Sequence, residues 1–102
     1  MAGADGMTTE FEWDENKRRS NVDKHGIDFG DAIEAFYDPA AYTILSPYPA
    51  DERRYVTIGL MRGALIAVIS TRRGDAVRII SARAARRNER QMYGAETKKD
   101  KK

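Results

Sequence analysis

The chain has 102 residues, 41% of them hydrophobic and 33% charged, which is typical of a single soluble globular domain with a charged surface. It contains no cysteine and one histidine, so the sequence excludes a disulfide framework and argues against a structural zinc site. No apolar stretch approaches the roughly 20 residues of a transmembrane helix, and the first residues lack the regions of a signal peptide. We therefore expect a cytoplasmic protein without a membrane span, metal or cofactor.

Charge is divided unevenly along the chain. Residues 1–52 carry 4 basic and 12 acidic side chains, whereas residues 53–102 carry 14 basic and 4 acidic ones, and together they give the net charge of +2. This asymmetry predicts either a basic surface that binds a polyanion such as nucleic acid, or a fold in which acidic helices neutralise a basic sheet. Charge alone does not choose between the two.

The chain is expected to begin with a flexible leader over residues 1–10, followed by a strand and a helix. Residues 11–13 alternate apolar and polar side chains, as a short edge strand does. Asp14 is placed to cap a helix that runs to about His25 and stops at Gly26. This helix contains few core residues, so its polar faces need another explanation.

A second helix and a strand complete the acidic half. Asp28 can cap the helix, and Pro39 ends it. Its apolar residues have the spacing of a core-facing stripe, namely Phe29, Ala32, Ile33 and Phe36. Residues 41–45 then predict a strand.

The basic half predicts three consecutive strands. Residues 54–60 and 77–82 alternate, and residues 64–69 form a continuous apolar run, as in a central strand covered on both faces. Turn sequences at Arg62-Gly63 and Arg73-Gly74-Asp75 join the three strands into an antiparallel meander.

An arginine-rich helix over residues 84–93 is expected to close the domain at Gly94, ahead of a lysine-rich, disordered tail over residues 95–102. The predicted fold class is therefore α+β, with N-terminal helices packed on a small antiparallel sheet and a C-terminal helix. One domain over residues 11–94 accounts for all of these elements.

Two blocks of residues carry a resemblance to a known family. The first comprises Phe11-Glu12-Trp13-Asp14, Lys17, Asn21, Lys24-His25-Gly26, Phe29 and Ala32. The second comprises Arg53-Arg54, Ile58-Gly59, Thr71, Arg78-Ile79-Ile80-Ser81-Ala82-Arg83, Ala85, Glu89 and Tyr93. In this order and at these separations, over roughly residues 11–93, the two blocks resemble the BrnT toxins.

The resemblance implies a fold like that of the RelE and ParE toxins and an activity that cleaves RNA and stops translation. It also implies neutralisation by a BrnA-like antitoxin with a ribbon-helix-helix domain, in a heterotetramer that binds operator DNA through the antitoxin. Two alternatives remain: a non-catalytic binding module that acts with the antitoxin in operon regulation, and a ParE-like toxin that targets gyrase.

RNA cleavage without a metal requires deprotonation of the ribose 2′-OH, stabilisation of the phosphorane and protonation of the leaving 5′-oxygen. A magnesium-dependent route would instead need clustered carboxylates, and the basic half of the chain contains only four. The sequence therefore favours a metal-independent mechanism.

The first helix supplies one set of candidate residues. Trp13, Lys17, Asn21 and Lys24 fall within an arc of about 80° on an ideal helix, with His25 just beyond it. Lys24 could contact phosphate, or transfer a proton if it is buried near arginines, and His25 could act as general acid or base. The alternatives are a solvated charged helix, a histidine that caps the helix end, and a tryptophan that belongs to the core.

The basic half supplies the second set. Arg83 could hold the scissile phosphate with two parallel hydrogen bonds. Strict alternation places Arg78 on the opposite face from Ser81 and Arg83. Glu89 and Tyr93 share a helix face and could serve catalysis, or they could be tertiary anchors in which Glu89 pairs with an arginine of its own helix, Arg86 or Arg90.

These considerations divide the candidates into two groups. The expected catalytic residues are Lys24, His25, Arg83, Glu89 and Tyr93. The expected RNA-binding residues are Trp13, Lys17, Asn21, Arg54, Arg78, Ser81, Arg86 and Arg90.

Overall fold

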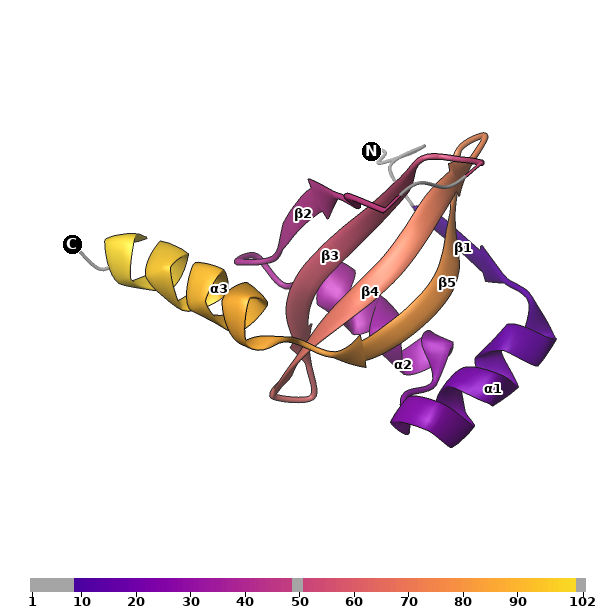
Figure 1. Cartoon of the computed structure of the whole chain (residues 1–102), viewed down its shortest axis with the longest axis horizontal. Helices are drawn as coiled ribbons and strands as arrows, with labels where there is room; N and C mark the ends of the chain where they lie inside the picture. The colour runs from indigo at the N-terminus through magenta and orange to yellow at the C-terminus, as the bar shows by residue number, and fades with distance from the viewer. Residues whose placement is uncertain (1–8, 49–50, 101–102) are drawn as a thin grey trace.

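The computed structural model describes residues 9–48 and 51–100, with side chains described up to residue 94. It is an α+β fold in which a five-stranded sheet carries helices on one face and sends a C-terminal helix outward (Figure 1). The elements in chain order are β1 (Glu10–Trp13), α1 (Glu15–His25), α2 (Phe29–Ala32), the 3-10 helix η2 (Ile33–Tyr37), β2 (Tyr42–Leu45), β3 (Arg54–Met61), β4 (Ala64–Arg73), β5 (Ala76–Ala84) and α3 (Arg87–Asp100).

The strands lie in the order β1-β5-β4-β3-β2. The antiparallel meander of β3, β4 and β5 is confirmed, and β2 adds to it antiparallel to β3. The prediction of a purely antiparallel sheet is wrong, because β1 pairs in parallel with β5. A local alternation identifies a strand but gives neither its partner nor its direction.

Helix α1 has the ends that the sequence predicts. The side chain of Asp14 accepts hydrogen bonds from the backbone N–H groups of Asn16 (2.8 Å) and Lys17 (3.3 Å). Gly26 ends the helix in the left-handed region, with φ of 70°, where glycine avoids the steric cost of a Cβ atom.

The second predicted helix is irregular. Asp28 caps it as expected, but α2 makes only one turn before the chain tightens into η2. There the carbonyl oxygen of Ala35 lies 2.4 Å from the position that a Cβ atom on Gly59 would occupy. Only a glycine in β3 therefore allows η2 to pack this closely on the sheet.

The sheet has two different faces. On the helix-covered face, the buried residues of α2, η2 and the sheet form one cluster, namely Ile27, Phe29, Ala32, Ala35, Ile66, Val68, Ile79 and Ala82. On the opposite side, here called the open face, a second cluster comprises Val56, Ile58, Leu65, Ala67 and Ala85. Strand β4 contributes to both clusters, which confirms the prediction of a central strand covered on both faces.

A β-bulge in β5 corrects the predicted orientation of Arg78. Arg78 lies opposite Thr71, whereas Ser81 lies opposite Ile69, with a register shift between the two pairs. Because Thr71 and Ile69 share a face of β4, the extra residue in β5 brings Arg78 onto the same face as Ser81. The expected opposition of Arg78 to Ser81 and Arg83 is therefore wrong.

Helix α3 differs from the prediction at both ends. Ala84 still pairs with Ile66, so β5 occupies the residues where the helix was expected to begin. The predicted stop at Gly94 is also wrong, because the helix continues to Asp100. Most of the predicted leader, residues 1–8, and the last two residues of the predicted tail lie outside the described residues. Within the described chain, no helix is long and apolar enough to cross a membrane.

Candidate active site

The open face contains a groove of about 290 Å³ between β2 and the beginning of α3. Val56 and Ile69 line its apolar floor, since they are neighbours in the register of β3 and β4. Its sides are formed by two stretches of chain, Ile44, Ser46, Pro47 and Tyr48 on one side and Arg83, Arg86, Asn88 and Glu89 on the other. An apolar floor bordered by guanidinium groups suits a nucleotide, which combines a flat base with an anionic phosphate.

Arg83 and Glu89 form an ion pair at the wall of this groove. Nη1 of Arg83 donates to Oε1 of Glu89 (2.8 Å) and Nη2 donates to Oε2 (3.0 Å). Glu89 also accepts from the backbone N–H of Arg86 at 2.7 Å, in the first turn of α3. Of the alternatives that the sequence left open, the anchoring ion pair is present, but its partner is Arg83 and not Arg86 or Arg90.

The ion pair fixes the charge of Glu89. The Arg83 guanidinium, helped by the Arg86 N–H and opposed by burial, holds the pKa of the Glu89 carboxyl below its usual range. Glu89 is therefore ionised at neutral pH and has no proton to donate. This arrangement supports a positioning role for Glu89 more than a role as general acid.

Arg83 keeps unused donors despite this pairing. A guanidinium has five N–H groups, and Nη1 uses both of its own on Glu89 and, at 3.3 Å, on the carbonyl of Ala84. Nη2 uses one. Within the described residues, the second Nη2 hydrogen and the Nε–H make no hydrogen bond, so they can meet a phosphate oxygen.

Two further arginines lie on the open face, one row beyond Val56 and Ile69. In register across the sheet, Arg54 pairs with Thr71 and Thr71 with Arg78. Arg54 Nε is buried and has no hydrogen-bond partner in the described part of the chain. Arg78 Nη1 donates to Oε2 of Glu12, in strand β1, at 2.9 Å. Rows two residues apart are separated by about 6.5 Å, so this row borders the groove floor.

Asn21 of α1 is buried and bonds to β5. Its Nδ2 donates to the carbonyl oxygens of Ile27 and Ala82, both at 2.9 Å, and its Oδ1 accepts from the N–H of Ala82 (3.1 Å) and Oγ of Ser81 (3.3 Å). The Asn21 amide thus bonds to both the N–H and the C=O of Ala82, as the backbone of a neighbouring strand does. It does so past the point where β1 ends, since the last residue of β5 that pairs with β1 is Ile79. This structural role accounts for the polar character of this part of α1.

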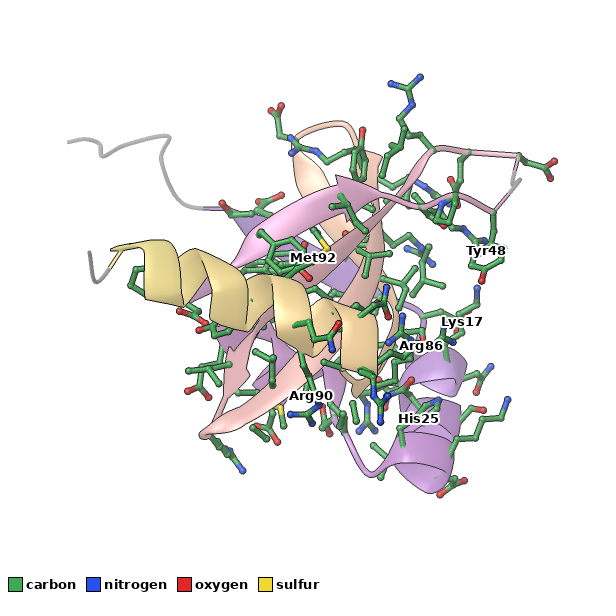
Figure 2. All side chains as sticks on the ribbon, turned by 60° about the vertical axis from the view of Figure 1, so that its left-hand side comes forward. Lys17, His25, Tyr48, Arg86, Arg90 and Met92 are labelled. Atoms are coloured by element: carbon green, nitrogen blue, oxygen red, sulfur yellow. The ribbon has the colours of Figure 1, made fainter. Side chains whose placement is uncertain are left out.

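The other predicted site residues in and beside α1 are more exposed than Asn21. Lys17, Lys24 and His25 are exposed, so the burial that would favour proton transfer by Lys24 is absent. Trp13 is half-buried and packs edge-on against Phe29, with ring centroids 6.1 Å apart, in agreement with the core alternative. In Figure 2, Lys17, His25 and Arg86 are labelled in the right-hand half of the view.

Tyr93 anchors α3 to the body of the protein. Its hydroxyl donates to Oδ2 of Asp38 at 2.7 Å, and the hydroxyl of Tyr42 donates to the Glu89 carbonyl at 2.9 Å. Burial and the bond to Asp38 raise the pKa of Tyr93 to about 12. Burial raises the pKa of Asp38, but hydrogen bonds from Tyr93 and two backbone N–H groups outweigh it, and the net change is downward. These contacts support the anchoring alternative for Tyr93.

Arg90 and Arg86 occupy different surroundings on α3. Arg86 lines the groove, whereas Nε of Arg90 donates to the carbonyl of Ala85 at 3.3 Å. Both side chains are exposed, and they are labelled in Figure 2. Of the two, Arg86 has the better position to meet RNA in the groove.

Sequence reasoning missed three polar residues of the groove. Tyr48 and Ser46 follow β2, and Asn88 lies in the first turn of α3. Tyr48 is highly exposed (70%), which leaves its ring available for stacking. The sequence signal for Tyr48 was its position between Pro47 and Pro49 in an uncharged loop. Among the described residues, histidine and the acidic side chains form no group of three that could hold a metal ion.

Comparison with known families finds a match. A family model described as "Ribonuclease toxin, BrnT, of type II toxin-antitoxin system" matches residues 13–89. The chain belongs to the BrnT family. It is therefore a ribonuclease toxin of a type II toxin–antitoxin system, an RNA-cleaving enzyme whose partner is an antitoxin. A comparison with curated proteins finds no match for the chain.

Proposed function

We propose that this BrnT toxin is a metal-independent endoribonuclease that cleaves RNA in the groove of the open face and thereby inhibits translation in the cytoplasm. The observation that carries the proposal is Arg83, which is held by Glu89 at the groove wall and keeps two N–H groups for a substrate phosphate. We further propose a RelE/ParE-like fold. We also propose that a BrnA-like antitoxin assembles with the toxin as a heterotetramer, which binds DNA only through the antitoxin.

The proposed reaction is an attack within the RNA strand. The ribose 2′-oxygen forms a bond to phosphorus and loses its proton to a base, while the bond from phosphorus to the 5′-oxygen breaks and that oxygen gains a proton. The products are a 2′,3′-cyclic phosphate and a 5′-hydroxyl. Negative charge accumulates on the phosphorane oxygens, so preorganised guanidinium groups stabilise this state more than the ground state.

The described residues suggest a role for each wall of the groove. Arg83 stabilises the phosphorane, Arg86 and the row of Arg54 and Arg78 attract the neighbouring phosphates, and a base lies against Val56 and Ile69. Tyr48 is placed to stack on this base. The cationic surroundings supply the charge stabilisation that a metal ion would otherwise provide, and this supports the metal-independent route.

His25 remains the proposed proton-transfer residue, and the exposed Lys24 is proposed to contact phosphate. They lie four and three residues after Asn21, hence on the side of α1 that faces β5 at Ala82, the neighbour of Arg83. Histidine exchanges protons readily near neutral pH, which suits a general acid or base.

The proposal is tested by incubating the purified chain with a long RNA in EDTA and identifying the new ends. We expect cyclic phosphate and 5′-hydroxyl ends from the parent chain, and at least about a 100-fold slower cleavage by Arg83→Ala, as for loss of an oxyanion-stabilising donor. His25→Ala reports on proton transfer, Lys24→Ala reports on phosphate contact, and Arg87→Ala, an exposed arginine outside the groove, is the matched control. A folded, antitoxin-free parent that leaves RNA intact in EDTA would overturn the proposal.

Cell growth gives an independent test. Expression of the toxin alone is expected to stop growth and protein synthesis, and co-expression of its antitoxin is expected to restore both. Normal growth at high levels of the folded toxin contradicts a toxic ribonuclease and favours the alternative of a non-catalytic partner in operon regulation.

A further inference from the structure

Strand β2 is an open edge of the sheet. It is the last strand in the sheet order and, among the described residues, pairs only with β3, as its place at the margin of the sheet shows (Figure 1). Thr43, Ile44 and Leu45 are all exposed. An edge strand with free backbone groups is a template for another extended chain, and proteins usually protect such edges with charges or covering elements.

The two edges of the sheet differ in this protection. The β1 edge carries Glu10 and Glu12, and the residue after β1 leads directly into α1. The β2 edge lies in an uncharged stretch, residues 39–50, in a chain of which one third is charged. Exposed Ile44 and Leu45 add apolar surface to this edge. The β2 edge therefore lacks the charged side chains that protect the β1 edge from pairing.

The hydrogen-bond pattern identifies the backbone groups available for pairing. The N–H of Ser46 donates to the carbonyl of Arg54 at 2.9 Å, so this pair exchanges bonds across β2 and β3. Because such pairs alternate in an antiparallel ladder, Ile44 and Tyr42 point their N–H and C=O groups inward, whereas Leu45 and Thr43 point theirs outward. The hydroxyl contact of Thr43 with Thr57, 2.9 Å, agrees with this phase, because side chains are closest in a pair without ladder bonds.

Both faces beside this edge are hollowed. On the helix-covered face, Thr43 lines a cavity of about 350 Å³ together with Phe36, Tyr55, Thr57, Ser70, Arg72 and Val77. On the open face, Ile44 and Ser46 line the candidate active site, whose opposite wall carries Arg83 and Arg86. Side chains of an added strand would alternate between these two spaces.

We propose that the antitoxin neutralises this toxin by adding an extended segment as a sixth strand on the outer edge of β2. The segment places one set of side chains in the cavity beside Thr43 and the other set, acidic in character, over the groove, where they pair with Arg83 and Arg86 and exclude RNA. The occupant is the antitoxin because the chain belongs to a toxin–antitoxin family. Acidic side chains of the antitoxin would complement the positive charge of Arg83 and Arg86 in the groove. The blocking of catalysis rests on the proposed function, whereas the strand pairing does not.

Amide hydrogen exchange of the full-length toxin, free and in complex with its antitoxin, tests the pairing directly. We expect the amides of Thr43 and Leu45 to exchange at least about tenfold more slowly in the complex, whereas those of Tyr42 and Ile44 are protected in both states. If Thr43 and Leu45 exchange equally fast in both states, the proposal is wrong.

Variants of Leu45 provide a second test. Leu45→Pro removes an outward N–H that β3 does not use, whereas Leu45→Ala removes more of the side chain and keeps the N–H. We expect Leu45→Pro to weaken antitoxin binding about tenfold relative to Leu45→Ala, with RNA cleavage by the free toxin unchanged. Equal binding by both folded variants contradicts the proposal. Protected amides in a toxin that cleaves no RNA would support the pairing while refuting the proposed function.

Discussion

Arg83 and Glu89 meet end to end, with two parallel hydrogen bonds of 2.8 and 3.0 Å between the last residues of β5 and the first turn of α3. Both side chains are largely buried, at 18% and 9% exposure. The pair fixes the direction of the guanidinium and also joins the C-terminal helix to the sheet. Its removal should therefore affect both catalysis and stability.

Glu89→Gln should separate these two effects. The amide keeps the shape but offers one acceptor oxygen, so Arg83 loses its fixed orientation and we expect cleavage to slow at least about tenfold. If Glu89 only positions Arg83, the loss falls on kcat more than on KM, because RNA binding depends on the other arginines as well. An unchanged kcat in a folded Glu89→Gln variant contradicts the positioning role.

Arg83→Ala should lower the free energy of unfolding more than Glu89→Gln does. Arg83→Ala leaves a buried carboxylate without its cation, and we expect the free energy of unfolding to fall by about 3 kcal/mol in urea titrations. The double variant Arg83→Ala, Glu89→Gln is expected to recover part of this loss, since the uncompensated charge is gone. Additive losses in the double variant would show that the pair is not energetically coupled.

Asn21→Ala should destabilise the fold without direct involvement of the groove arginines. The substitution leaves the N–H and C=O groups of Ala82 without their side-chain partner, and we expect a loss of about 2–3 kcal/mol. Asn16→Ala, an exposed position on the same helix, is the control and should change stability by less than about 0.5 kcal/mol. Similar losses at both positions would point to helix propensity instead of the bond to β5.

Gly59→Ala should displace η2 from the sheet. A Cβ atom at Gly59 would meet the Ala35 carbonyl at 2.4 Å, so we expect a loss of about 1–3 kcal/mol, measured by thermal or urea unfolding. Gly94→Ala is the matched control, because a Cβ atom there meets nothing within 4 Å. Within helix α3 that change should stabilise by up to about 1 kcal/mol. A neutral Gly59→Ala would show that η2 can move at little cost.

The raised pKa of Tyr93 predicts that the free energy of unfolding falls at alkaline pH. Its pKa is raised to about 12 by burial and by Asp38, while an unfolded tyrosine titrates near 10. The folded protein therefore holds a proton that the unfolded chain has released, and the stabilising contribution, complete below about pH 10, is lost as pH rises toward 12. Urea midpoints between pH 8 and 11.5 should fall more steeply for the parent chain than for Tyr93→Phe. Tyr42, whose pKa burial also raises, contributes the remaining slope.

Local signals in the sequence predicted much of the fold. Asp14 and Gly26 define α1 because a capping carboxylate and a left-handed glycine act within one turn of the chain. The three strands of the meander follow from alternation and turn sequences for the same reason. The end of α3 was missed because glycine only weakens a helix, and Gly94 keeps a helical backbone where no left-handed turn is formed.

The contacts that build the site were harder to predict, and the bond from Asn21 to Ala82 was missed because it joins residues about sixty positions apart. Asn21 was assigned to an RNA-binding face of α1, but its amide is used by β5, and no local pattern shows this. The pairing of Arg83 with Glu89 was missed for a different reason. An arginine-rich helix offers several partners to one carboxylate, and only the geometry of the β5–α3 junction selects among them.

The bulge in β5 has a consequence for the tolerance of this strand to insertions and deletions. Arg78 and Arg83 lie five positions apart in the chain, a spacing that strict alternation puts on opposite faces, so they share a face only because Ile80 adds one position to the strand. Deleting Ile80 would restore strict alternation and turn one of the two arginines toward the helix-covered core. The number of residues in this strand is therefore constrained as tightly as their chemistry, and relatives that keep the activity should vary in side chains here but not in length.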